Sequence, residues 1–209
     1  MKTKDQLIAF ENRVKELFAA GELPFLVHMS GGNEDQLIDI FSHAKQGDWF
    51  FSTHRSHSHY LLAGGNEENL LNLIKTGSSM FVFDSARNFL TSSILAGTAC
   101  IAVGVALQLK AERSSNRVWC FLGDGAEEEG HFYEAVLMAH GNDLPVTFVI
   151  EDNDRSVDSP KAVRTKGKRI DWPSCVVRYS YKPTYPHAGA GLPPGSVRFN
   201  PAIVSKYAS

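Results

Sequence analysis

Hydrophobic and polar positions follow two periods along this chain, and together they predict an α/β protein. Apolar residues three or four positions apart are typical of amphipathic helices, whereas short unbroken or alternating apolar runs are typical of strands. The predicted helices cover residues 4–20, 34–44, 67–75 and 96–110, with a further helix through 132–139. The predicted strands cover residues 49–51, 118–122, 145–150 and 174–181.

The segment 119–156 carries the most informative polar residues. A buried strand ends in Gly123-Asp124-Gly125, a helix follows, and a second strand ends just before Asn153. This order predicts a βαβ unit, in which both strands are parallel and end at the same edge of a sheet. Open parallel sheets bind ligands at that edge.

Asp124 and Asn153 form a candidate metal site. A carboxylate, an amide oxygen and a nearby backbone carbonyl make an oxygen-only ligand set, which suits Mg²⁺ or Ca²⁺ with phosphate oxygens completing the shell. The neighbouring glycines allow phosphate groups to approach the backbone closely.

This segment resembles the diphosphate motif of thiamine diphosphate enzymes. Gly-His-Phe-Tyr-Glu-Ala and Asp-Leu-Pro-Val-Thr-Phe-Val-Ile-Glu are most similar to the alpha subunit of 2-oxo acid dehydrogenases of the pyruvate and branched-chain types. The resemblance extends over roughly residues 11–159. It implies a three-layer, doubly wound, mostly parallel sheet, with thiamine diphosphate and Mg²⁺ as cofactors.

The resemblance also implies roles for individual residues. Asp124 and Asn153 would bind the metal through their side chains, and Arg155 would bind it through its carbonyl. The coenzyme would lie against the turn Gly123, Asp124, Gly125 and Ala126. Asp152 departs from the usual Asn-Asn pair of the family, but it does not occupy the ligand position.

The run His54-Arg55-Ser56-His57 resembles the Tyr-Arg-x-His of the same subunits. It implies that Arg55 grips the coenzyme diphosphate, that His57 lies in the active site as a catalytic residue, and that His54 replaces a phosphate-binding Tyr. Three histidines at 54, 57 and 59 also suggest zinc, but no Cys or acid completes a set, so an anion site is favoured. His59 is expected at the surface or behind the site.

The segment 88–97 resembles the family loop that touches the aminopyrimidine ring and places an apolar side chain beneath the coenzyme. Ser93 and Leu95 take these positions, although core packing is an equal alternative for Leu95. Phe81 stands where the family has a His.

Composition bounds the remaining possibilities. The 209 residues carry a net charge of −2, which gives no broad electrostatic case for nucleic acid. No apolar run approaches the roughly 20 residues of a membrane helix, and the N-terminus lacks a signal-peptide core, so a cytoplasmic protein without a membrane segment is expected. The three cysteines have no metal spacing, and Cys100 and Cys120 are expected to be buried thiols.

The C-terminal part is less informative. The basic stretch 161–169 is predicted to be a solvated loop, with a coenzyme-side or partner-docking loop as the alternative. The Pro- and Gly-rich tail 182–209 is expected to be extended, laid on the surface, and to reach another subunit. We therefore expect a coenzyme-binding domain at 1–160, with 161–209 as part of it or as an interface arm.

In the family, the carboxylate that activates the aminopyrimidine comes from a pyrimidine-binding domain on a beta subunit, and no second α/β domain is evident here. The resemblance thus implies an oxidoreductase subunit for oxidative decarboxylation of a small 2-oxo acid, active only with a beta-type partner in an α₂β₂ assembly. Two alternatives stay open: the diphosphate-binding half of a split transketolase-like enzyme, and a degenerate, non-catalytic subunit.

Overall fold

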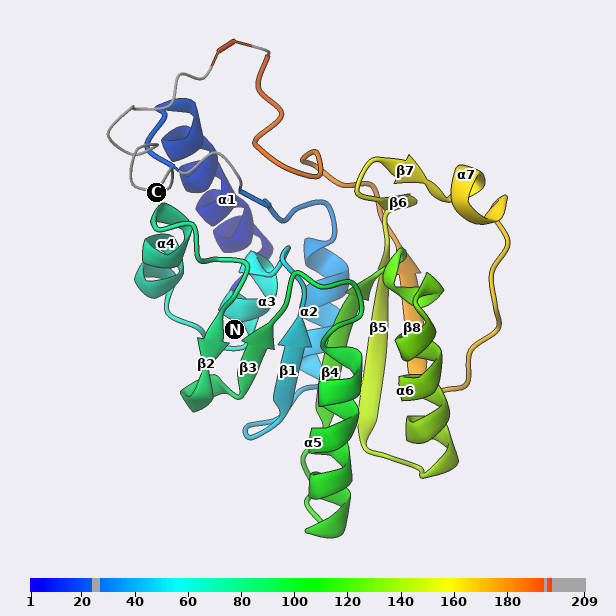
Figure 1. The fold of residues 1–209 in the computed structure, drawn as a ribbon. Coiled ribbons are helices and arrows are strands. Elements are labelled where there is room, and N and C mark those ends of the chain that lie inside the picture. Colours follow the sequence, from blue (N-terminus) through cyan, green and yellow to red (C-terminus); the bar gives the residue numbers. More distant parts are fainter. Residues whose placement is uncertain (24–26, 194, 197–209) are drawn as a thin grey trace, which may run out of the picture. The chain divides into compact units, whose positions relative to one another are not determined.

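The computed structural model describes residues 1–23, 27–193 and 195–196 (Figure 1). The chain forms two compact units, which are described separately. The first unit contains residues 1–42, 54–82 and the chain from 183 onward, and the second contains residues 43–53 and 83–182.

The second unit is built on a six-stranded sheet in the order β2-β3-β1-β4-β5-β8. All neighbouring strands are parallel except β2 and β3, which are antiparallel. The strands are β1 (Trp49–Ser52), β2 (Phe83–Asp84), β3 (Phe89–Thr91), β4 (Val118–Gly123), β5 (Val146–Asp152) and β8 (Val176–Ser180). The α/β class and the mostly parallel sheet are therefore confirmed.

The two central strands explain the unbroken apolar runs in the sequence. Every residue of β5 and the first five of β4 are buried, as expected for strands covered on both faces. Helices α5 (Ala99–Ala111) and α6 (Gly130–Gly141) lie side by side over one face of the sheet in Figure 1. Small residues of α5 such as Ala102 and Ala106 let it pack closely, while Phe132 of α6 meets Phe148 of β5 edge to face.

The order of the strands creates a switch point. From β1 the chain crosses to β3 on one side of β1 and then returns to β4 on its other side. The connections that leave β1 and β4 therefore diverge at their carboxyl ends, which is where open α/β sheets bind ligands. Residue 54 follows β1 closely in sequence and Asp124 directly follows β4, so the predicted site residues come from these two exits.

Several short elements of the second unit were not predicted. These are the 3₁₀ turns η1 (Ser85–Arg87) and η2 (Ala126–Glu128), the hairpin of β6 (Arg155–Ser156) and β7 (Ser159–Pro160), and helix α7 (Lys161–Thr165). The predicted helix through 132–139 is observed as part of α6, which begins at Gly130 with Glu129 as its N-cap, after Glu127 and Glu128 have formed part of η2.

The first unit contains helices α1 (Lys4–Ala19), α2 (Glu34–Ser42), α3 (His57–Leu62) and α4 (Glu67–Lys75). Thr3 and Gln6 form a capping box at the start of α1, and the Asn66 side chain accepts from the backbone N–H of Asn69 at the start of α4. The predicted α4 is confirmed residue for residue, with its apolar side chains buried. Helix α3 was missed because its sequence has no amphipathic period, and all six of its residues are buried.

The start of the C-terminal tail packs within its own chain. The Thr184 N–H donates to the Gly31 carbonyl at 3.1 Å, and the Gly189 N–H donates to the Val27 carbonyl at 2.8 Å. The described part of this stretch has bends at 184–185 and 187–189 and lies on residues 27–31 of the same chain, so the expected extended form is not observed there. The predicted reach toward another subunit concerns 197–209 as well, and those residues lie outside the described part.

One burial prediction, for Cys100, was wrong, and for His59 the surface alternative is excluded while a place behind the site stays a prediction. Cys100 is exposed, because α5 is apolar on both its faces and none of the described residues covers its outer face at this position; Cys120 is buried as expected. His59 is only 2% exposed and its ring stacks on Phe41. Within the described residues, no helix combines the length and apolarity that crossing a bilayer requires.

Candidate functional site

The exits of β4 and β5 bring two predicted site segments into contact. The strands pair in parallel up to their last residues, so Asp124 and Asn153 follow neighbouring strand ends. A Cβ atom added to Gly125 would lie 2.3 Å from the Ser156 hydroxyl oxygen, which shows how closely the Gly-Asp-Gly turn packs on the β6 segment. The adjacency predicted from the βαβ pattern is thus observed.

Asp124 is fully buried at this edge of the sheet. Its Oδ2 accepts from the Arg164 guanidinium at 2.7 Å and lies 3.8 Å from Lys161 Nζ. Its Oδ1 is buried without a hydrogen-bond partner among the described residues. Burial raises the pKa of Asp124 from 3.8 to about 6; the cations of Lys161 and Arg164 oppose this rise, and the Asp152 carboxylate adds to it.

Asn153 closes a tight turn after β5. Its Oδ1 accepts from the Arg155 backbone N–H at 3.1 Å, and the Arg155 guanidinium donates to the Asp158 carbonyl at 3.3 Å. The following residue, Asp154, has a positive φ of 62°. Asn153 is half-buried and its amide oxygen faces its own turn, so the predicted ligand roles of Asn153 and Arg155 remain predictions.

The other turn residues differ in their surroundings. Gly123 ends β4, and among the described residues a Cβ atom there would meet no atom within 4 Å outside its immediate neighbours. Ala126 is buried at the start of η2. The backbone at Gly123 therefore has open space beside it, which a bound group can approach.

Asp152 is the centre of an ion-pair network that the sequence did not reveal. It accepts from Lys161 Nζ at 2.5 Å and from Arg178 Nη1 at 3.0 Å, and Arg178 also pairs with Glu127. Burial alone would raise the pKa of Asp152, but the hydrogen bonds from Lys161 and from the Asp154 backbone N–H outweigh it and leave that pKa below its ordinary value.

The prediction of a solvated loop at 161–169 was wrong for its first half. Lys161 is 5% exposed, and the side chain of Arg164 is 13% exposed. The hairpin after β5 turns α7 back over the strand ends, so both cations lie against Asp124. The sequence showed a basic segment, but it contained no local signal that α7 would pack over the ends of the strands.

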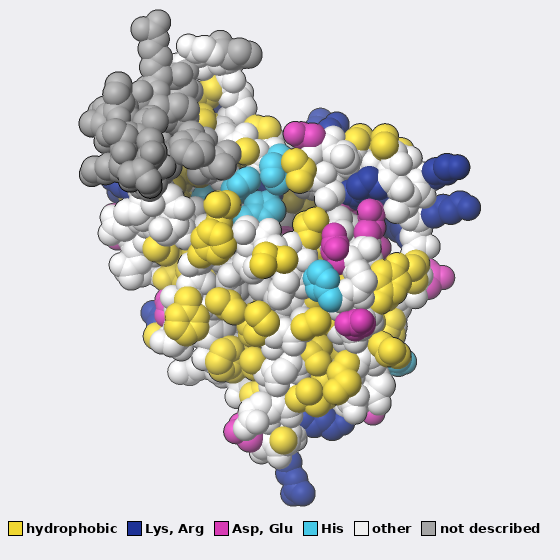
Figure 2. Space-filling model, viewed as in Figure 1, with side chains coloured by type: hydrophobic (Ala, Val, Ile, Leu, Met, Phe, Trp, Pro, Cys, Tyr) yellow, Lys and Arg dark blue, Asp and Glu magenta, His cyan; other side chains and the backbone are white. Residues whose placement is uncertain are grey.

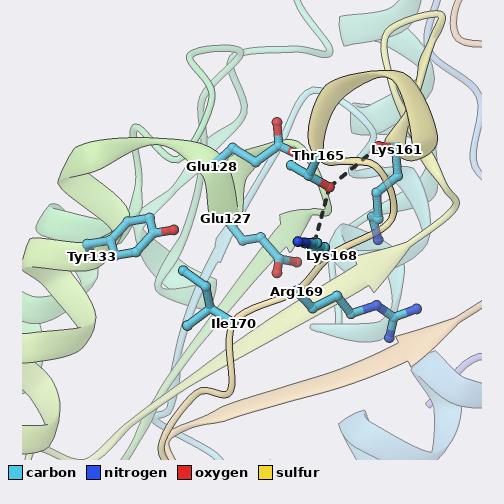
Figure 3. A pocket seen from close by; sticks show the side chains of 8 residues that line it. All are labelled: Glu127, Glu128, Tyr133, Lys161, Thr165, Lys168, Arg169 and Ile170. Carbon is cyan, nitrogen blue, oxygen red and sulfur yellow. Dashed lines mark hydrogen bonds between the residues drawn. The ribbon is translucent and has the colours of Figure 1, made fainter.

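A cavity of about 210 Å³ lies beside this network. Figure 3 shows acidic and aromatic side chains from η2 and α6 facing basic side chains from α7 and the chain after it. Its lining residues are Glu127, Glu128, Tyr133, Lys161, Thr165, Lys168, Arg169 and Ile170. The cavity is smaller than the pockets of roughly 300–1,000 Å³ that enclose whole cofactors, so it suits part of a ligand.

Ser93 and Leu95 lie in the exposed loop before α5. Leu95 is 41% exposed, which shows that the core-packing alternative for this residue was wrong. Its backbone carbonyl accepts from His131 Nε2 at 2.9 Å, which ties the loop to the start of α6. The predicted contacts of Ser93 and Leu95 with the coenzyme remain predictions.

The first unit carries the remaining predicted residues. The Arg55 guanidinium donates to the Met29 carbonyl at 2.9 Å and to the His187 carbonyl at 3.3 Å. His57 Nδ1 lies 2.9 Å from Glu11 Oε1, and both side chains are buried. Glu11 also accepts from the Ser30 backbone N–H at 3.1 Å, so it holds the imidazole in a defined orientation.

His54 does not group with His57 and His59. It lies instead beside His28 and His187, with ring centroids 4.6 Å and 5.3 Å away. Burial, aided by the neighbouring His28 and Arg55, lowers the pKa of His54 from 6.5 to about 3. Sequence reasoning missed His28, His187 and Glu11, because nothing local links them to residues 54–57.

This α/β chain has candidate oxygen ligands after β4 and β5 and an Arg-His segment after β1. These features together are typical of one class of proteins, and the sequence matches that class. The family described as "Dehydrogenase E1 component" matches residues 2–170, and this chain belongs to it.

Individual proteins similar to this chain narrow the family further. The chain is 34% identical over 165 residues to the alpha subunit of acetoin:2,6-dichlorophenolindophenol oxidoreductase from Bacillus subtilis, a match that covers 74% of this chain and 50% of the relative. It is 32% identical over 154 residues to the protein of the same name from Cupriavidus necator, covering 69% and 46%. It is 30% identical over 174 residues to the pyruvate dehydrogenase E1 component subunit alpha of Rickettsia felis, covering 78% and 53%. The chain thus spans about half the length of these relatives.

Proposed function

We propose that this chain is the thiamine diphosphate- and Mg²⁺-binding alpha-type part of a 2-oxo acid dehydrogenase. The observation that carries the proposal is Asp124. It is a buried carboxylate at the end of β4 with one oxygen that has no partner among the described residues, and it lies in a turn that packs on the segment of Asn153. A buried carboxylate is costly unless its charge is compensated, and an oxygen of it that has no hydrogen-bond partner is suited to bind a cation.

The donor set fits Mg²⁺ and a diphosphate. Asp124 and Asn153 would bind the ion through their side chains and Arg155 through its carbonyl, all hard oxygen donors. The open space beside Gly123 would admit a phosphate group, and Arg55 would pair with the diphosphate. When bound, thiamine diphosphate would supply the carbon nucleophile and the electron sink that decarboxylation of a 2-oxo acid requires.

His57 would act as an acid–base or orienting group. A carboxylate only accepts, so the contact with Glu11 assigns the proton to Nδ1 and leaves the lone pair on Nε2. Nε2 is buried and has no partner among the described residues. It would therefore accept a proton or a hydrogen bond from a substrate group that reaches it.

A beta-type partner is part of the proposal, and the exposed apolar surface of the second unit supports it. Figure 2 shows hydrophobic side chains concentrated on the face where α5 and α6 lie in Figure 1. The exposed large apolar residues of this surface are Ile94, Leu95, Ile101, Leu107, Tyr133, Leu137 and Met138. Contiguous apolar surface of this kind marks protein interfaces. We expect this face to meet a pyrimidine-binding chain or a second alpha chain in an α₂β₂ assembly.

A degenerate, non-catalytic subunit is the second candidate, and one observation favours it. Lys161 and Arg164 already bring positive charge to Asp124, where the proposal puts a metal ion. The names of the relatives favour the dehydrogenase over the split transketolase-like alternative.

Calorimetric titration with thiamine diphosphate, in Mg²⁺ and again in EDTA, tests the proposal. We expect metal-dependent binding that is lost in Asp124→Asn and kept in Asp154→Asn, a matched change at an exposed carboxylate in the neighbouring turn. Absence of binding in the wild type would support the degenerate alternative. For the partner, turnover of a 2-oxo acid by the purified chain alone would refute the requirement for a second polypeptide.

A further inference from the structure

Three histidines of the first unit converge on one point. One ring nitrogen from each of His28, His54 and His187 lies within 4.8 Å of those of the other two. His28 is buried, and the other two are half-buried. Figure 2 shows histidine side chains gathered at the surface of the molecule, consistent with a group that solvent can reach.

Backbone pairing of distant segments creates this cluster. The two hydrogen bonds from Thr184 and Gly189 align the tail with residues 27–31, which puts His187 beside His28. A Cβ atom on Gly31 would lie 3.1 Å from atoms of Thr184, so the two backbones are close at this point. Three separate stretches of the chain therefore each contribute one imidazole.

A hydrogen bond orients the His28 imidazole as metal sites require. His28 Nδ1 lies 2.8 Å from the His187 carbonyl, which only accepts, so the proton is on Nδ1 and the lone pair is on Nε2. The same carbonyl accepts from Arg55 at 3.3 Å, which holds the backbone of His187 in place. Histidines that bind metals usually donate their second ring nitrogen to a carbonyl or carboxylate in this way.

The ring geometry differs from that of a stacked aromatic group. The three ring pairs have centroids 4.6, 5.0 and 5.3 Å apart and interplanar angles of 72°, 67° and 63°. Rings tilted to this degree can direct their edges, which carry the nitrogen lone pairs, toward a common centre. Nitrogens around tetrahedral zinc lie about 3.3 Å apart, given Zn–N distances of about 2.0–2.1 Å. Small side-chain rotations would close the present separation.

We propose that His28, His54 and His187 bind a divalent transition-metal ion of the zinc class, with the fourth position open to water or an anion. Three imidazoles favour such an ion over Mg²⁺, which prefers oxygen ligands. The ion would hold the tail segment to residues 27–31 and to the segment between β1 and α3. Its nitrogen ligands differ in chemistry from the oxygen donors of the second unit, and the inference does not depend on the proposed function.

Titration of the metal-free chain with Zn²⁺ in excess Mg²⁺, followed by calorimetry, tests the proposal. We expect one Zn²⁺ per chain, no competition from Mg²⁺, and unchanged binding in Asp124→Asn. Loss of an outer hydrogen-bond partner costs about 10–100-fold in affinity, so His187→Ala, which removes a ligand, is expected to cost at least about 100-fold. His43→Ala, a change at an exposed histidine outside the cluster, is the matched control.

Two further measurements keep the test decisive if His187→Ala folds poorly. His54→Tyr introduces the residue found in the family and is expected to fold, which circular dichroism in EDTA would check, while losing Zn²⁺ binding. Substitution with Co²⁺ should give the intense visible absorption of a four-coordinate ion. Equal Zn²⁺ affinity in the wild type, His187→Ala and His54→Tyr would overturn the proposal, as would the weak spectrum of octahedral Co²⁺.

Discussion

Asp124 is expected to make the folded chain less stable as the pH rises, because its carboxylate is buried. Its pKa is raised from 3.8 to about 6, chiefly by burial. Between these values the folded state holds a proton that the unfolded chain has lost, so the free energy of unfolding falls as the pH rises. At about 1.4 kcal/mol per pKa unit, the stability lost through Asp124 is about 3 kcal/mol and is complete above about pH 6.

Urea unfolding of the wild type and of Asp124→Asn between about pH 4 and pH 7 measures this quantity. Asn does not titrate, so the difference between the two free energies of unfolding isolates Asp124. The ion pair with Arg164 forms only while Asp124 is ionised, so its effect is already part of the pKa of Asp124 and is no separate offset. We expect the variant to gain about 2.4 kcal/mol relative to the wild type over this range, because the unfolded carboxyl is already partly ionised at pH 4.

The matched control is Asp154→Asn, the same change at an exposed carboxylate in the neighbouring turn. A pH-independent difference for Asp124→Asn would refute the reasoning, since it would mean that the carboxylate keeps an ordinary pKa. Saturating Mg²⁺ and thiamine diphosphate should suppress the loss of stability in the wild type, because a bound cation compensates the buried charge.

Three further predictions concern single side chains of the second unit. Arg164→Met removes the cation that holds Asp124 Oδ2, so Mg²⁺-dependent coenzyme binding in calorimetry should tighten by about tenfold or more; weaker binding would mean that the guanidinium contacts the diphosphate instead. Asp48→Ala leaves the indole N–H of Trp119, held at 3.0 Å, without its buried acceptor, and urea unfolding should show a loss of about 3 kcal/mol or more, whereas a loss under about 1 kcal/mol would contradict this account. Leu137→Glu, at a side chain 73% exposed, should change stability by less than about 0.5 kcal/mol yet weaken association with a beta-type chain in sedimentation experiments; unchanged association would exclude this face as the interface with the beta-type chain.

The central βαβ unit shows how far sequence reasoning extends. Unbroken apolar runs predicted β4 and β5, and the turn residues between them predicted parallel strands with a common polar edge. Parallel neighbours must end on the same side, so the closeness of the Asp124 and Asn153 turns followed from connectivity alone. Helix α4 was equally predictable, because Asn66 caps it and its apolar spacing marks one buried face.

The local sequence pattern did not predict the burial of a residue where that residue's surroundings come from another segment of the chain. Cys100 and Leu95 sit in apolar sequence but are exposed, since periodicity does not say whether a second chain covers a helix face. The sequence predicted that Lys161 and Arg164 belong to a solvated basic loop. In the structure the hairpin after β5 reverses the chain direction, so both side chains lie beside Asp124.

The sequence by itself determined the class of fold, the family and the sheet edge that carries the candidate site, because those depend on periodicity and on short-range connection. The tertiary structure alone decided which charges oppose the buried carboxylate of Asp124 and which histidines meet. His28, His54 and His187 are far apart along the chain, and the hydrogen bonds of the tail to residues 27–31 bring His187 to the other two. Such contacts depend on the course of the backbone between distant residues. The type of side chain at one position does not determine that course.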